Sequence, residues 1–165
     1  MKPILIASAL VLVSCTSHAD RLDANKTVAR QLIDAINSND LDALDSVVAP
    51  DVVRHSQATP GVTVRDIDDF KNFIRQDKQS VPDARIDIEI MVAEGDYVAM
   101  IASYRGTQSG PMGPFPASNR PVDLRFLSFI RLSGGHIAEI WAEWDNLSML
   151  TSLGHIAPPS APGAP

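Results

Sequence analysis

Only one of the 165 residues is a cysteine, Cys15, and it lies close to the N-terminus. The chain therefore has no internal disulfide, and the rest of it has no thiolate for nucleophilic catalysis or for a cysteine-based zinc site. Its four histidines include no pair spaced His-x-x-x-His or similarly, so we expect no metal site. The sequence also lacks a Gly-x-Ser-x-Gly motif and a phosphate-binding loop, and we expect no cofactor.

Basic residues are few and scattered. Lys and Arg together number 14 against 20 Asp and Glu, which gives a net charge of −6. Without a basic block, we expect neither nucleic acid nor an anionic lipid surface as a partner of the folded part. The hydrophobic content of 45% and the length fit one globular domain with a real core. Aromatic residues make up only 5%, so each of the two tryptophans is informative.

The N-terminal residues are typical of a secretory signal. Lys2 precedes an apolar run over residues 4–13 that is too short for an ordinary transmembrane helix. Two cleavage sites compete. Leu12-Val13-Ser14-Cys15 resembles the bacterial lipobox and would leave Cys15 as a lipid-modified first residue, whereas Ser17-His18-Ala19 fits ordinary cleavage before Asp20. We favour the lipoprotein, because the only cysteine stands where a lipobox needs it, and expect a periplasmic or lipid-anchored protein of the bacterial cell envelope.

Hydrophobic periodicity divides the rest of the chain into helices and strands. The spacing predicts helices over residues 23–37, 39–50 and 66–79, and a short one over 146–153. Alternation predicts a short extended segment at 51–55 and long strands over 86–92, 97–107, 121–132 and 137–145, with a Gly134-Gly135 hairpin before the last. Helices on one side of an antiparallel sheet predict an α+β fold, and a strongly bent sheet would leave a cavity over them. We place the domain at residues 20–155, between a signal at 1–19 and a disordered Pro/Ala-rich tail at 156–165.

The last strand is the most informative segment. If alternate residues share a face, that face carries Ile137, Glu139, Trp141, Glu143 and Asp145. A tryptophan beside three carboxylates suits the wall of a pocket that holds an acid next to an aromatic ring.

Asp145 is the candidate base on this face. Burial beside Trp141 would raise its pKa, and repulsion from Glu139 and Glu143 would raise it further toward the working pH. The alternative is structural, because Asp145 directly precedes a short helix and is well placed to cap it. A carboxylate in a closed pocket would support the first interpretation, and bonds to the amides of Ser148 or Met149 would support the second.

Four stretches, in their order and spacing, resemble one protein family. They are Asn39-Asp40-Leu41-Asp42-Ala43-Leu44 leading to 49–55, then Val81-Pro82-Asp83-Ala84 with 93–99, the Gly- and Pro-rich loop at 106–120, and 135–141 leading to Asp145 and Leu153-Gly154. From about residue 25 to 154 the chain resembles the SnoaL-like polyketide cyclases, also called ester cyclases, of the nuclear-transport-factor-2-like superfamily. The resemblance implies a cone-shaped, curved antiparallel sheet packed on helices around a deep apolar pocket. It also implies cofactor-free acid/base catalysis by an aspartate that closes a ring by intramolecular aldol addition, with Asp145 as the similar position.

Further candidate site residues come from other segments. His55 could bond the substrate or the carboxylate, although a histidine of this kind is more often structural. Tyr104 and Arg125 could stabilise a developing enolate oxygen. Trp141 is a candidate ligand-lining residue, as are Met112 and Phe115 in the loop at 108–120.

Three functions remain open on the sequence. The first is a cofactor-independent lyase, isomerase or cyclase that acts on a small hydrophobic carbonyl compound. The second is a module that binds a hydrophobic ligand without chemistry, and the third is a domain that dimerises through an exposed sheet face. Export argues against polyketide tailoring, and Trp144 and Thr151-Ser152 depart from the residues that relatives commonly show.

Overall fold

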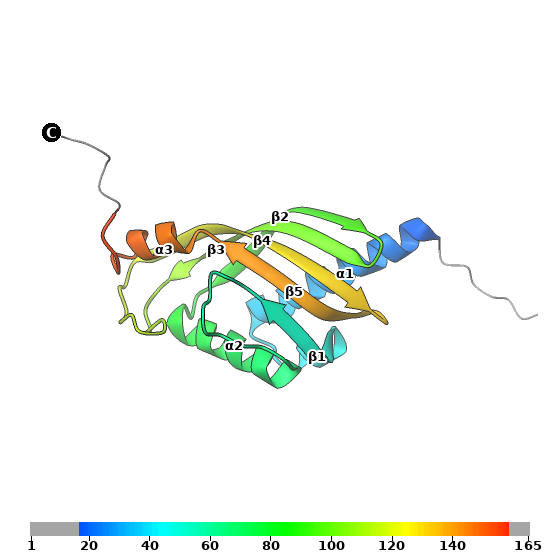
Figure 1. Cartoon of the computed structure of the whole chain (residues 1–165), viewed down its shortest axis with the longest axis horizontal. Helices are drawn as coiled ribbons and strands as arrows, with labels where there is room; N and C mark the ends of the chain where they lie inside the picture. Colours follow the sequence, from blue (N-terminus) through cyan, green and yellow to red (C-terminus); the bar gives the residue numbers. More distant parts are fainter. Residues whose placement is uncertain (1–16, 159–165) are drawn as a thin grey trace, which may run out of the picture.

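The computed structural model describes residues 17–158, and the proposed lipobox and most of the Pro/Ala-rich tail lie outside them. Three helices pack on one face of a bent five-stranded sheet, which confirms the α+β fold (Figure 1). In Figure 1, β1 forms the sheet edge beside α2, and α3 lies at the end of the molecule far from the start of α1.

The first helix, α1, spans His18–Ser38 and begins before the predicted residue 23. Its start is fixed by a capping box, in which the Ser17 hydroxyl accepts from the Asp20 amide and the Asp20 carboxylate accepts from the Ser17 amide. The second, α2 at Ile67–Ser80, matches its prediction and is capped by Asp66. A third, α3 at Asn146–Ser152, closes the fold.

The predicted helix over residues 39–50 is wrong. Only Ala43–Ser46 forms a short 3-10 helix, η1, and β1 then spans Val48–His55. The β-branched valines of this segment suit a strand. The sheet supplies the partner, since the Ile137 amide bonds the Val47 carbonyl and β1 runs parallel to β5.

The remaining strands form the predicted antiparallel meander. They are β2 at Arg85–Glu94, β3 at Tyr97–Thr107, β4 at Pro121–Ser133 and β5 at His136–Trp144, in the spatial order β1-β5-β4-β3-β2. The β4–β5 hairpin turns at Gly134 and Gly135, whose φ angles of 58° and 82° are disfavoured for other residues.

A bulge in β2 changes which of its residues face the helices. The pairing with β3 shifts between Ile88 and Ile90. Ile86 and Ile88 pack against the core as alternation predicts, but beyond the bulge Met91 takes the inward place. Ile90 and Val92 instead face solvent, with 56% and 59% of their surface exposed. A single bulged residue inverts the alternation that follows it.

A second irregularity, between Arg131 and Leu132, affects β5 in the same way. It turns Ile137 into the core, where it is fully buried, so Ile137 does not share a face with Glu139 and Trp141 as predicted. We call the sheet face that packs on the helices the inner face, and the opposite one the outer face. Trp141 lies on the outer face with Phe129, and Trp144 lies on the inner face opposite Phe126.

Two clusters fill the interior. The larger joins α1, η1, α2 and β1 to the inner face of the sheet around Leu32, Leu44 and Ile74. The smaller, which we call the α3 cluster, is formed by Val81, Ala84, Val122, Met149 and Leu153. Several half-buried side chains pack against the α3 cluster, and Tyr104 and Met112, two of the predicted site residues, are among them.

Candidate functional site

Asp145 caps α3 and does not face a pocket. Its carboxylate accepts the Ser148 amide at 2.9 Å and the Ser148 hydroxyl at 2.6 Å, and the side chain is exposed to water. These bonds hold the pKa of Asp145 below its usual value, because they stabilise the charged form. The predicted upward pKa shift is therefore wrong, and the geometry is that of an N-cap.

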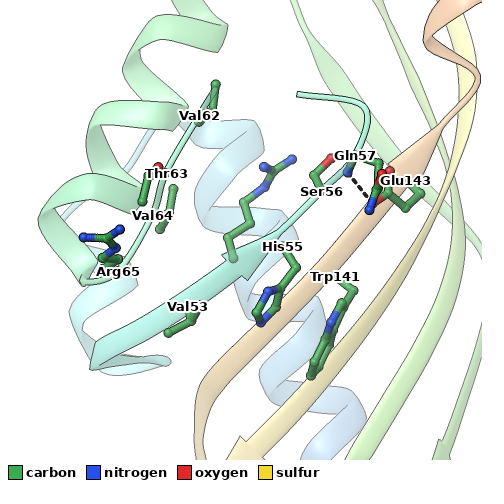
Figure 2. Close-up of a pocket in the computed structure, with 11 residues that line it drawn as sticks. Val53, His55, Ser56, Gln57, Val62, Thr63, Val64, Arg65, Trp141 and Glu143 are labelled. Atoms are coloured by element: carbon green, nitrogen blue, oxygen red, sulfur yellow. Dashed lines mark hydrogen bonds between the residues drawn. The ribbon is translucent and has the colours of Figure 1, made fainter. Parts of the chain in front are cut away.

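His55 and Trp141 do come together, on the outer face. Their rings stack with centroids 4.9 Å apart and project to the same side of β1 and β5 (Figure 2). His55 Nε2 lies 3.0 Å from Glu139, which also accepts from Arg131 at 2.8 Å. These two partners lower the pKa of Glu139, so it stays ionised and holds the His55 ring against Trp141.

A cleft of about 570 Å³ opens beside this stack, between β1 and residues 62–65 (Figure 2). Glu143 lines it, but its carboxylate accepts the amides of Gln57 and Ala58 at 2.6 and 3.0 Å. Glu143 thus ties the segment after β1 to β5. The cleft is open to solvent, and the one acid among its lining residues, Glu143, is already bonded to these two backbone amides.

The other candidates occupy separate places. Arg125 is exposed on the outer face, where it bonds Glu89. Phe115 stacks on His155 with centroids 4.7 Å apart, and its backbone pairs with that of Met112. Met112 packs against the α3 cluster, which places it on the inner side with Tyr104. The predicted residues therefore do not form one site.

The pairing of Tyr104 with Asp77, both half-buried on the inner side, was not predicted. The Tyr104 hydroxyl donates to both oxygens of Asp77, at 3.0 and 3.1 Å. Burial outweighs this bond and raises the pKa of Asp77 to about 6. The same burial, together with the Asp77 charge, raises the pKa of Tyr104 well above its usual value, so Tyr104 remains a donor.

Arg54 adds a buried positive charge to this region. Its guanidinium lies 4.2 Å from the centre of the Phe73 ring and donates to Thr59 at 3.0 Å. Its charge favours the ionised form of Asp77, as does that of Lys78 on α2. Desolvation lowers the pKa of Arg54, and the charges of Glu143 and Asp77 oppose that shift.

Tyr104 shares its side of the sheet with several apolar side chains. Tyr104, Met112, Leu124, Trp144 and Leu150 all pack against the α3 cluster. Each remains partly exposed, so solvent reaches this end of the inner face. The arrangement combines an acid of raised pKa with an apolar wall, as small-molecule sites commonly do.

The sequence does carry a signal for Asp77. The apolar stripe of α2 runs through Phe70, Phe73 and Ile74, and Asp77 follows at the next inward position, before Val81. A carboxylate on the apolar stripe of a helix is uncommon unless it has a partner. The partner, Tyr104, comes from a strand 27 residues away, which periodicity alone does not identify.

Within residues 17–158, no three His, Cys, Asp or Glu side chains are grouped so that they could hold a metal ion. In the same part of the chain, no helix is long and apolar enough to cross a membrane.

Comparison with known proteins now assigns the family. Residues 26–153 match the family model of the SnoaL-like polyketide cyclases. The chain belongs to this family. Among curated proteins, none matches the sequence.

Solved structures agree with this assignment. IdmH from Streptomyces antibioticus, a proposed polyketide cyclase, is 30% identical with a TM-score of 0.69, and the match covers 79% of this chain and 98% of IdmH. TsrD from Streptomyces laurentii is 25% identical with a TM-score of 0.72 over 81% of this chain and 97% of its own. A proposed SnoaL-like polyketide cyclase from Jannaschia sp. CCS1 is 22% identical with a TM-score of 0.77, over 87% and 99%. The last supports the cone-shaped fold alone.

Proposed function

We propose that this SnoaL-like domain is a cofactor-independent acid/base enzyme that removes a proton next to the carbonyl of a small hydrophobic compound. The observation that carries the proposal is the Asp77–Tyr104 pair, whose acid has a pKa of about 6. Asp77 replaces Asp145 as the proposed base. The reaction class is that of a cyclase, lyase or isomerase.

The chemistry needs a base that is ionised at neutral pH yet more basic than an ordinary aspartate. Asp77 meets both conditions, since its pKa lies below neutrality and above the usual value of 3.8. The Tyr104 hydroxyl holds the carboxylate in one orientation, and the charge of Arg54 stabilises its ionised form. Leu124, Met112 and Trp144, which pack with Tyr104 against the α3 cluster, suit a hydrophobic substrate.

Proton exchange on a surrogate ketone tests the proposal without knowledge of the natural substrate. In deuterium oxide, the protein should exchange the methyl protons of acetylnaphthalene for deuterium, as followed by proton NMR. Asp77→Asn should abolish the exchange, because an amide is not a base at these pH values. Asp145→Asn is the matched control and should leave the rate within about twofold, since Asn caps a helix as well as Asp does.

The pH profile gives an independent check. The exchange rate should rise as pH increases through about 6, where Asp77 loses its proton. A rate that is flat across this range, or that survives in Asp77→Asn, would contradict the assignment of Asp77 as the base. Binding of the ketone without any exchange would favour the alternative function, a non-catalytic module for hydrophobic ligands.

We further propose export and lipid anchoring at Cys15. The helix start supports the lipobox interpretation, because cleavage before Cys15 leaves the Ser17–Asp20 capping box intact, whereas cleavage before Asp20 removes the capping residue. In bacterial fractions, the protein should be in the membrane, and Cys15→Ala should release it or block its processing. A soluble periplasmic form of the unaltered protein would indicate ordinary cleavage instead.

Finally, we propose that a second copy of the chain covers the outer face. Ile90, Val92, Leu127 and Phe129 are exposed there and line a groove of about 400 Å³ with Trp141. Apolar patches of this kind commonly mark protein contacts. The same face carries the ion pairs Arg125–Glu89 and Arg131–Glu139, so each copy offers both charges to a two-fold partner.

A further inference from the structure

The indole of Trp144 presents an unusual buried donor. Among the described residues, three buried side-chain polar atoms have no hydrogen-bond partner within the protein, namely Ser56 Oγ, Thr151 Oγ1 and Trp144 Nε1. A hydroxyl rotates and can accept as well as donate, whereas an indole N–H can only donate and is fixed in the ring plane. A buried N–H without an acceptor is unfavourable, and such groups in folded proteins commonly have a water or ligand partner.

The position of Trp144 places this donor on the side of the proposed base. Trp144 on β5 pairs with Phe126 on β4. Tyr104 on β3 pairs with Leu124, which is the next residue of β4 on the same inner face as Phe126. Trp144, Tyr104 and Leu124 all pack against the α3 cluster. Trp141 lies on the opposite face of the sheet and stacks on His55.

Among the side chains that pack on the α3 cluster, the other polar groups leave the donor role to Trp144. The Tyr104 hydroxyl donates its proton to Asp77, and the Asp77 carboxylate is an acceptor at neutral pH. The remaining side chains that share the cluster with Tyr104 and Trp144 are Met112, Leu124 and Leu150, none of which donates. A neutral oxygen in an apolar ligand therefore has one available side-chain donor in this set.

We propose that Trp144 Nε1 donates a hydrogen bond to the carbonyl oxygen of the ligand and selects oxygen-bearing over purely hydrocarbon compounds. This assignment rests on the proposed function, because it takes the ligand to bind on the inner face of the sheet, on the side of Asp77. A donor to the carbonyl oxygen would stabilise the negative charge that develops there when a base removes the neighbouring proton.

Two probes of the same shape test the proposal. Acetylnaphthalene carries a carbonyl oxygen, and ethylnaphthalene replaces it with hydrogens. Trp144→Phe keeps an aromatic ring and removes the N–H, so it should weaken acetylnaphthalene binding about tenfold and change ethylnaphthalene binding by less than about twofold. The matched control Trp141→Phe, on the outer face, should change neither affinity.

NMR of the indole N–H groups gives a direct readout. The two tryptophans give two indole resonances, which Trp141→Phe and Trp144→Phe assign. Saturating acetylnaphthalene should move the Trp144 resonance downfield, and ethylnaphthalene should not. Equal losses of affinity for both probes, an unmoved Trp144 resonance, or no binding of the ketone would overturn the proposal.

The result also separates the two proposals. If acetylnaphthalene moves the Trp144 resonance and no proton exchange occurs, the donor assignment stands and the enzymatic function falls. If exchange occurs and depends on Asp77 but Trp144→Phe changes neither probe, the enzyme stands and the donor assignment falls.

Discussion

Two aspartates of this chain have pKa values moved in opposite directions, and their neighbours explain both shifts. Asp145 faces water and accepts two bonds from Ser148, which stabilise its charge. Asp77 lies against β3, where loss of hydration outweighs the bond from Tyr104. Asp145, which directly follows Trp144 in the sequence, is therefore the exposed aspartate, and Asp77 is the one that loses hydration. Hydration and partners in the fold decide which carboxyl is tuned toward neutral pH.

The raised pKa of Asp77 predicts a dependence of stability on pH. A group whose pKa rises from 3.8 to about 6 on folding contributes stability below 3.8, and this contribution is lost as pH rises through about 6. A shift of one pKa unit corresponds to about 1.36 kcal/mol, so the loss of stability amounts to at most about 3 kcal/mol. Asn at this position does not titrate. The free energy of unfolding of Asp77→Asn, relative to that of the unaltered protein, should therefore increase by up to this amount as pH rises from about 4 to about 8.

Urea unfolding at the two pH values measures this difference. Asp145→Asn is the control. Its free energy of unfolding relative to the unaltered protein should not increase with pH, because the Asp145 pKa is lowered rather than raised. If the Asp77→Asn difference is constant across the range, the Asp77 carboxyl is not desolvated in the folded protein.

At the scale of elements, regular periodicity was predictable and its interruptions were not. The stripe of α2, the bounds of β3 and the Gly134-Gly135 turn follow from local pattern, and the structure confirms them. The bulge at Ile88–Ile90 depends on how two strands pair, and one extra residue there inverts the faces that follow. The Asp77–Tyr104 pair could not be predicted for the same reason, since these two residues meet only through tertiary packing.

The loop between β3 and β4 is organised by one buried amide. Gln108 is fully buried, and its Nε2 donates to the carbonyls of Gly110 and Pro116 at 3.1 and 3.0 Å. Its Oε1 lies 2.7 Å from His155 Nε2, which joins the loop to the segment after α3. Since Met112 belongs to this loop, Gln108 also fixes one side of the inner apolar wall.

Gln108→Leu should therefore destabilise the protein by about 2 kcal/mol, because it leaves polar groups without partners. It should also speed hydrogen exchange of the amides at 110–119. Gln76→Leu, at an exposed position of α2, is the matched control and should change the free energy of unfolding by less than about 0.5 kcal/mol. Unchanged exchange in the loop of Gln108→Leu would show that the backbone alone holds it in place.

At the scale of the whole molecule, the two faces of the sheet have different partners. The inner face is covered by helices and carries the Asp77–Tyr104 pair. The outer face carries exposed apolar residues that no described helix covers, and the β2 bulge is the reason that Ile90 and Val92 lie there. Because the proposed base and the proposed dimer contact lie on opposite faces, a change at one should leave the other intact.

Leu127→Lys tests this separation. Leu127 is the most exposed large apolar residue of the outer face, at 63%, and a lysine there would bring two like charges near the two-fold axis of a dimer. Analytical ultracentrifugation should give a dimer for the unaltered protein and a monomer for Leu127→Lys. Leu147→Lys is the matched control, because Leu147 is 55% exposed but lies on α3, and it should remain dimeric.

Proton exchange on acetylnaphthalene should proceed in the Leu127→Lys monomer at a rate within about threefold of the dimer, since Asp77 and Tyr104 belong to a single chain. An unaltered protein that is monomeric at all concentrations would refute the outer-face dimer. A monomer that has lost exchange while keeping its melting temperature would show instead that the second copy supports the inner site, and the two faces would then be coupled through the strands that they share.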